Sequence, residues 1–247
     1  MNGKLIVFEG VEGCGKTTQI QLCGEWLQSL GIPVLITREP GGTELGLHLR
    51  RLLLQKAEGE SSEPSAFPIT DRAELLLYAA DRSQHVEELK PILAAGKIIL
   101  CDRYTDSTVA YQGYGRGLDM NLIVQLNTIA TNGLESDLTF WLDVDVEAGL
   151  ARKHKASAIA DGDDASGDSA SSDADAVTTP NNRGDRIEQE NIAFHRRVQK
   201  GYTELAASYP ERTVRVDASV SVDAIRQAIQ KILLLKLDEW GYKQVKR

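Results

Sequence analysis

Long hydrophobic runs are absent from this sequence of 247 residues. No apolar stretch approaches the roughly 18 residues that a membrane-spanning helix requires. The first residues also lack the basic segment and the apolar segment of a secretory signal. We therefore expect a cytoplasmic protein without a membrane partner, of a length suited to a single α/β domain.

Cysteine is scarce, and basic residues are missing from one part of the chain. Cys14, Cys23 and Cys101 have neither disulfide nor metal-ligand spacing, so we expect reduced thiols. The net charge is −8, but six acids lie between Lys155 and Arg183, where no basic residue occurs. Without these acids the charge is nearly balanced. No basic surface typical of a nucleic-acid partner is indicated.

Residues 156–182 differ in composition from the rest of the chain. They are mainly Ala, Ser, Asp and Gly, and their only large apolar residues are Ile159 and Val177. Such a segment buries too little apolar surface to offset the entropy lost on ordering. We expect a single domain, 1–247, whose lid covers about 149–188 and contains a disordered acidic insertion at 156–182.

Short apolar runs alternate with segments of helical period. The runs predict strands at 4–9, 33–37, 97–101, 138–144 and 213–216, and the periodic segments predict helices at 18–30, 70–95, 118–132, 188–208 and 221–237. This alternation predicts an α/β fold with a five-stranded parallel sheet and helices on both faces. A ligand site is then expected at the carboxyl ends of the strands.

Residues 10–17 match the phosphate-binding pattern GxxxxGK[ST] between a predicted strand and a predicted helix. The glycines let backbone N–H groups surround phosphate oxygens at a helix N-terminus. Lys16 would reach the terminal phosphates of a nucleoside triphosphate, and Thr17 would hold Mg²⁺. The expected ATP-binding residues are Gly10, Val11, Glu12, Gly13, Cys14, Gly15, Lys16, Thr17 and Thr18.

Other polar pairs occupy positions suited to a second ligand. Asp102 and Arg103 follow a predicted strand, where the carboxylate can bind Mg²⁺ and the guanidinium can neutralise a phosphate. Tyr78 and Arg82 share a helix face and can grip a planar base. A core tyrosine beside a surface arginine explains that spacing equally well.

Two further segments carry candidate cations. The loop at 38–43, sequence REPGGT, begins with Arg38 after the second strand, but its spacing does not identify a ligand. Arg152, Arg183 and Arg186 can form a mobile cationic lid, because phosphoryl transfer needs positive charge and exclusion of water. Ordinary surface arginines are the alternative.

Together these motifs resemble the bacterial thymidylate kinases, and among them the class with a lid arginine. The resemblance runs through nearly the whole chain, at 8–18, 38–43, 79–82, 102–104, 107–113 and 185–188. It implies a three-layer P-loop kinase fold with a mobile lid. It also implies a homodimer that uses Mg²⁺ and transfers the ATP γ-phosphoryl group to dTMP, giving dTDP for dTTP synthesis.

The resemblance implies roles for the residues of the dTMP site. Glu12 would accept from the 3′-hydroxyl, Tyr78 would stack on thymine, and Arg82 would read the 4-carbonyl. Ser107 or Thr108 would contact the ring nitrogen, and Tyr111 would crowd the 2′ carbon. The remaining implied dTMP ligands are Arg38, Glu39 and Arg103.

The resemblance also implies where the catalytic cations lie. Asp102 would be the Mg²⁺-linked carboxylate beside Thr17. Because the P-loop carries Cys14 and no arginine, the lid would supply the cation that stabilises the phosphoryl group during its transfer. The implied catalytic residues are Lys16, Arg103, Arg152, Arg183 and Arg186.

Two other functions fit the phosphate loop. A deoxynucleoside kinase acting on thymidine would need a base for the 5′-hydroxyl, and Glu39 is the candidate. A non-catalytic nucleotide-binding regulatory module would use the acidic insertion to dock a partner. The acceptor that is phosphorylated discriminates among the three.

Overall fold

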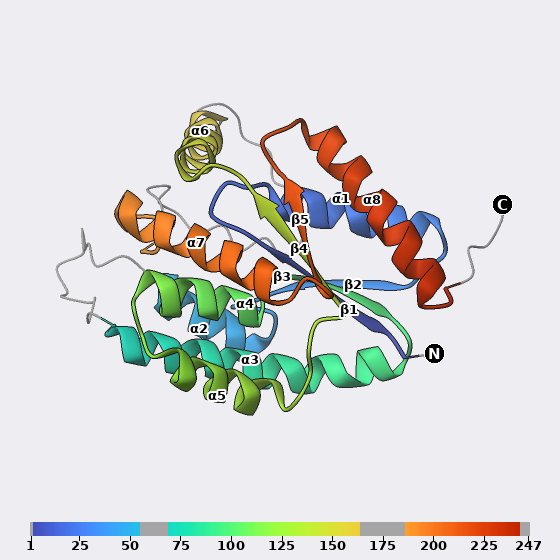
Figure 1. Ribbon diagram of the computed structural model, residues 1–247, viewed down its shortest axis with the longest axis horizontal. Helices are drawn as coiled ribbons and strands as arrows, with labels where there is room; N and C mark the ends of the chain where they lie inside the picture. Colours follow the sequence, from blue (N-terminus) through green and yellow to red (C-terminus); the bar gives the residue numbers. More distant parts are fainter. Residues whose placement is uncertain (1, 55–68, 164–185, 243–247) are drawn as a thin grey trace.

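A five-stranded parallel sheet forms the centre of the computed structural model, which describes residues 2–54, 69–163 and 186–242 (Figure 1). The strand order is β2-β3-β1-β4-β5. The strands are β1 Lys4–Glu9, β2 Val34–Arg38, β3 Ile98–Asp102, β4 Leu138–Asp143 and β5 Thr213–Asp217. The predicted α/β class and the five parallel strands are confirmed.

Helices cover both faces of the sheet, with α1 and α8 on one side and α3 and α5 on the other (Figure 1). The first helices are α1 Lys16–Ser29, α2 Glu44–Leu54, α3 Asp71–Ala94, α4 Thr105–Thr108 and the π-helix η1 Val109–Gly115. They are followed by α5 Met120–Thr131, α6 Val146–Asp163, α7 Ile192–Ser208 and α8 Val222–Glu239. None of the helices formed by the described residues is long and apolar enough to cross a membrane.

Alternate side chains of β1 enter different layers of the core, as the pleat of a strand requires. Leu5 and Val7 pack with Val86 of α3, whereas Phe8 packs in a second cluster with Ile20 of α1. Because β1 is buried on both faces, its sequence is continuously apolar up to Glu9. This burial fixes the position of the phosphate loop that follows β1.

Four helices lie where the sequence predicted none, namely α2, α6 and the short α4 and η1 after β3. α2 has leucines at 45, 49, 52 and 53, which share one helix face at the spacing i, i+4, i+7 and i+8, so its helical period is present in the sequence but was overlooked. It begins after Thr43, whose hydroxyl accepts from the Gly46 backbone N–H at 2.9 Å. α6 could not be predicted from hydrophobic periodicity, because its second half lies in the segment that starts at residue 156 and contains few apolar residues.

The expectation of disorder throughout 156–182 is wrong for its first part. Residues 156–163 form the last turns of α6. Alanine is the strongest helix former, and Ala156, Ala158 and Ala160 extend a helix that already starts at Val146. Residues 164–182 lie outside the described residues.

Helix α7 begins later than predicted, at Ile192 instead of residue 188. The Asn191 side chain caps it by accepting from the Phe194 N–H.

Candidate active site

A cavity of about 590 Å³ opens where β1, β2 and β3 end. It lies between the phosphate loop, the start of α3, the segment after β3 and the first half of α6. The predicted site residues that line it are Glu12, Gly13, Gly15, Lys16, Thr17, Thr18, Arg38, Glu39, Tyr78, Arg82, Asp102, Arg103, Ser107, Thr108, Tyr111 and Arg152. Gly10, Val11 and Cys14 complete the loop behind this lining.

The phosphate loop passes directly from β1 into α1. Gly15 has a φ of 92° and occupies the N-cap of α1, where it has no side chain with which to cap the helix. The unpaired N–H groups of the first helical turn are therefore available to an anion. Lys16 is buried, and its ammonium donates to the carbonyls of Gly10 and Val11 at 3.0 and 3.1 Å.

The residues expected at a metal lie together. Thr17 Oγ1 donates to Asp102 Oδ2 at 3.4 Å. Asp102 Oδ1 is buried and has no hydrogen-bond partner among the described residues. A hydroxyl beside a carboxylate with one unsatisfied oxygen fits Mg²⁺, which prefers oxygen ligands and keeps several waters.

Arg103 lies at the centre of the cavity in an unusual backbone conformation. Its φ is 72°, in the left-handed region that side chains other than glycine seldom adopt. Its guanidinium pairs with Glu12, donates to the Gly10 carbonyl at 3.3 Å and lies 4.8 Å from the ring centre of Tyr111. The strained turn thus holds a cation against the phosphate loop.

Glu12 is held as an anion. Burial raises the pKa of its carboxyl, but the nearby cations Arg103, Lys16 and Lys153 outweigh burial and bring the pKa to about 2. The Tyr111 hydroxyl also donates to Glu12, at 3.2 Å. The carboxylate can therefore accept a hydrogen bond from a ligand at any ordinary pH.

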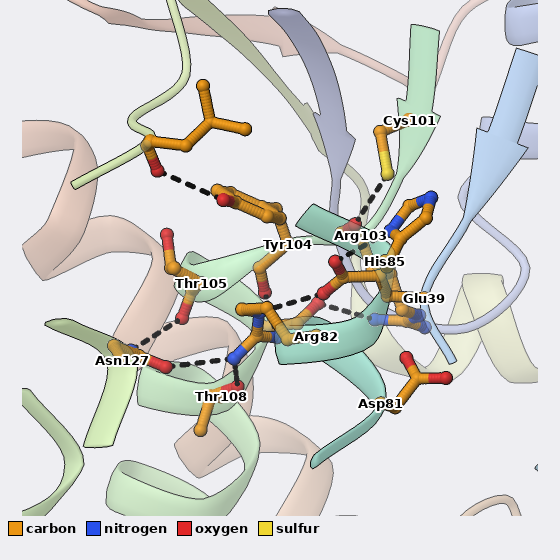
Figure 2. A network of polar contacts seen from close by, with 12 residues as sticks. Glu39, Asp81, Arg82, His85, Cys101, Arg103, Tyr104, Thr105, Thr108 and Asn127 are labelled. Carbon is orange, nitrogen blue, oxygen red and sulfur yellow. Dashed lines mark hydrogen bonds and ion pairs between the residues drawn. The ribbon is translucent and has the colours of Figure 1, made fainter. Parts of the chain in front are cut away.

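Arg82 is buried in a polar network beneath the cavity (Figure 2). It donates to Glu39 and Thr108 at 2.8 Å, to Asn127 at 2.8 Å and to the Tyr104 carbonyl at 3.0 Å. A guanidinium has five N–H groups, so these bonds leave one Nη2 proton for a ligand. The alternative of a surface arginine at this position is excluded by its burial.

Glu39 has both carboxylate oxygens occupied (Figure 2). One accepts from Arg82, and the other lies 2.9 Å from His85 Nδ1. Asp81, beside them, accepts from the Gly41 N–H at 3.1 Å. Burial raises the pKa of Asp81 to about 6, and the negative charge of Glu39 adds to the effect. Glu39 therefore anchors α3 to the loop after β2.

Glu9 is a site residue that sequence reasoning missed. It is completely buried and accepts from the Tyr104 N–H at 2.8 Å, the Ser107 hydroxyl at 2.5 Å and the Tyr202 hydroxyl at 2.8 Å. A lone carboxylate that ends an otherwise apolar strand is the signal that could have identified it. Glu9 holds Ser107 and the turn after β3 in place.

The predicted lid arginines lie in different places. Arg152 lines the cavity and donates to the carbonyls of Ala218 and Ser219, at 2.8 and 3.3 Å, in the loop after β5. Arg186 is not among the cavity-lining residues of the described chain; it pairs with Glu74 and donates to the Leu53 carbonyl at 3.1 Å. Arg183 lies outside the described residues.

Further cavity residues were not predicted as site residues. Gln112, from η1, is buried and lines the cavity, and its amide nitrogen donates to Glu74 at 2.7 Å. Lys153 of α6 lines the cavity and pairs with Glu188 at 3.0 Å. The remaining unpredicted lining residues are Pro40, Arg50, Leu54, Ile187 and Glu188 itself. These residues cannot be identified from sequence motifs, because they come from separate segments of the chain that meet only in the folded protein.

Comparison with known protein families gives one match over more than half of the chain. The family model described as thymidylate kinase matches residues 8–166. This range includes the phosphate loop, α3 and the turn after β3.

Curated relatives match nearly the full length. A thymidylate kinase of Nostoc punctiforme is 65% identical over 96% of this chain and 98% of its own. One of Nostoc sp. is 62% identical over 97% of this chain and 100% of its own. Among solved structures, the crystal structure of thymidylate kinase from Ehrlichia chaffeensis has a TM-score of 0.67 and 31% identity, over 94% of this chain and 100% of that one.

Proposed function

The chain belongs to the thymidylate kinase family, whose members transfer the γ-phosphoryl group of ATP to dTMP to give dTDP, and we propose that this transfer takes place in the cavity beside the P-loop. The main observation in support of this proposal is that the P-loop, the Arg103–Glu12 pair and the buried Arg82 line the same cavity. The cavity thus combines a polyphosphate site with a site for a base, a sugar and a second phosphate.

On the donor side, the backbone N–H groups at the start of α1 and the Lys16 ammonium bind the ATP phosphates. The phosphate oxygens replace the loop carbonyls that Lys16 contacts. Thr17 and Asp102 would hold Mg²⁺, which neutralises charge on the phosphates when it is bound. Arg152 lines the same cavity and connects α6 to the loop after β5 through the carbonyls of Ala218 and Ser219.

On the acceptor side, Tyr78 stacks on thymine, and the remaining Arg82 N–H donates to its 4-carbonyl. Ser107 or Thr108 contacts the ring nitrogen, and Tyr111 crowds the 2′ carbon so that deoxyribose is preferred. The Glu12 carboxylate accepts from the 3′-hydroxyl. The acceptor phosphate binds Arg38 and Arg103. Glu39 belongs to the acceptor site because it holds Arg82 in place.

The reaction asks little covalent chemistry of the protein. The acceptor phosphate is already an anion at neutral pH, so no general base is needed. Positioning in line and neutralisation of charge supply the rate. We propose that Lys16, Arg103 and a lid cation, from among Arg152, Arg183 and Arg186, act on the transferring group.

The domain organisation and assembly belong to the same proposal. The chain is one domain, 1–247, with its lid at about 149–188, and it works in the cytoplasm as a homodimer. Apolar side chains exposed on α3 and α5, Leu76, Val124 and Ile129, support this face as the dimer contact.

The thymidine-kinase alternative lacks a base. Glu39, its candidate, has both oxygens occupied by Arg82 and His85. The regulatory module does not fit either, because full-length relatives at 62–65% identity carry the name of an enzyme.

A coupled ADP-release assay with Mg²⁺ and ATP tests the proposal, with dTMP, thymidine, dUMP, UMP and dCMP as acceptors. We expect strong turnover with dTMP, weaker turnover with dUMP, and little with the other three. Turnover of thymidine at the rate of dTMP would contradict the assignment of the acceptor site.

A further inference from the structure

Glu74 of α3 is completely buried, yet it has no direct place in the cavity lining. Its Oε1 accepts from Gln112 Nε2 at 2.7 Å and from Arg116 Nε at 3.3 Å. Its Oε2 accepts from Arg116 Nη2 at 3.2 Å and also pairs with Arg186. Two arginines, Arg116 before the lid segment and Arg186 near its C-terminal end, therefore hold this carboxylate in one orientation.

The carboxylate determines which end of the Gln112 amide it can bind. An ionised carboxylate only accepts hydrogen bonds, so only the NH₂ group of Gln112 can face it. Gln112 lines the cavity, and with its nitrogen held on Glu74, the amide oxygen is the end left for a ligand. The hydrogen-bond acceptor that faces the base is therefore the amide oxygen of Gln112.

We propose that Glu74 is a positioning residue for acceptor-base selectivity, acting through the orientation of the Gln112 amide. Thymine and uracil carry an N3–H donor, whereas cytosine has an acceptor at N3. The Gln112 amide oxygen would accept from the N3–H beside the hydroxyl of Ser107 or Thr108, so it favours the first two bases and leaves cytosine facing a second acceptor. A site built to bind a substrate N–H discriminates strongly against an analogue that lacks it. This inference rests on the proposed placement of the base in the cavity.

The substitution Glu74→Gln tests the orientation directly. A glutamine at this position has one accepting and one donating end. Arg116 and Arg186 only donate, so they attract the carbonyl oxygen of the new amide and leave its NH₂ group for Gln112. The Gln112 amide then turns and presents its nitrogen to the cavity. We expect the ratio of kcat/KM for dTMP to that for dCMP to fall by about tenfold or more.

Two controls separate this role from a structural one. Glu190→Gln removes another carboxylate partner of Arg116 but does not touch Gln112, and it should leave the ratio unchanged. Glu74→Asp keeps an accept-only group, so it should keep the selectivity even if the rate falls. If Glu74→Gln does not fold, Glu74→Asp still decides the matter, because a lost dTMP preference in that variant contradicts the proposal.

The outcome also distinguishes failure of this inference from failure of the base placement. Gln112→Ala should raise the KM for dTMP if the base lies in the cavity. If it does so while Glu74→Gln slows dTMP and dCMP equally, the positioning role of Glu74 is overturned alone. If Gln112→Ala leaves the KM for dTMP unchanged, the placement of the base is wrong and the inference falls with it.

Discussion

At the scale of single residues, the site depends on charges held in place before any ligand arrives. Glu12 is kept ionised by three nearby cations, and Arg103 is fixed by a left-handed turn and by its pair with Glu12. Lys16 is buried on the carbonyls of its own loop. Such preorganisation lets charges act in the transition state without being rearranged.

Replacing Lys16 should remove most of the activity and leave the fold intact. We expect Lys16→Met to lower kcat by about 10²–10³, since loss of one charge-stabilising donor commonly has this effect. Lys90→Met, on the exposed surface of α3, is the matched control and should retain full activity. Steady-state kinetics and thermal unfolding of both variants check this. A kcat for Lys16→Met within threefold of the unmodified chain would contradict the role of Lys16.

Glu9 should make stability depend on pH near neutrality. Burial raises its pKa to about 7, and Asp106 adds to the shift, whereas Arg103 and Ser107 oppose it. Between the ordinary value of 4.5 and about 7, the folded chain holds a proton that the unfolded chain has released. The free energy of unfolding therefore falls as pH rises through this window, by up to about 1.4 kcal/mol per pH unit from this group.

Urea unfolding at pH 5, 6 and 7 measures this contribution. In Glu9→Gln the group cannot titrate, so stability should change less across the window than in the unmodified chain. Glu88→Gln, an exposed carboxylate on α3, should follow the unmodified profile. Parallel profiles for Glu9→Gln and the unmodified chain would show that Glu9 does not titrate there.

At the scale of elements, the phosphate loop and α6 touch through their backbones. Gly13 has a φ of 71°, and a Cβ at this position would overlap the Gly149 carbonyl of α6. The loop that binds ATP phosphates is thus in direct contact with the helix that leads to the lid.

Gly13→Ala should destabilise the protein more than an alanine at a glycine with similar φ and free space. Gly133, with a φ of 79° and no atom within 4 Å of the place that a Cβ would occupy, is the matched control. We expect Gly133→Ala to cost about 1 kcal/mol from backbone strain alone. Gly13→Ala should cost about 2–4 kcal/mol, because overpacking adds to the strain. Equal losses in urea unfolding would contradict the contact.

The strands could be predicted from sequence, but α4, η1, α6 and most partners of the site residues could not. β1 and β3 can be recognised from their continuous apolar runs, because both faces of these strands are buried. The leucines at 45, 49, 52 and 53 of α2 do have helical spacing, so this helix could also have been predicted. The partners of Arg82 are separated from it by 22 to 45 positions, and only the folded chain brings them together. The P-loop, in contrast, is local, so its contacts follow from the motif.

At the scale of the whole molecule, α3 and α5 lie on the other side of the sheet from α8 (Figure 1). Both α3 and α5 carry exposed apolar side chains. A contact between two copies through this face would bury side chains that otherwise meet water. Because α3 also carries Tyr78, Arg82 and Glu74, such a contact would support the acceptor site from behind.

Ile129→Glu should therefore weaken self-association, because a charge would be buried at the centre of the contact. We expect light scattering coupled to size exclusion to show a dimer for the unmodified chain and a monomer for this variant. Leu235→Glu, similarly exposed but on α8, should remain a dimer. A dimer lost only in Leu235→Glu would move the contact to the other face.

The central place of β1 has a consequence for synthesis. β1 precedes every other strand in the chain, but its neighbours are β3 and β4, and the partner Tyr202 of Glu9 lies 193 positions later. A ribosome that adds about 5–20 residues per second needs about 10–40 s to make that interval. Throughout it, this apolar strand is present without its full set of partners. The support of Ser107 on the acceptor side of the cavity is thus completed only after α7 has been made.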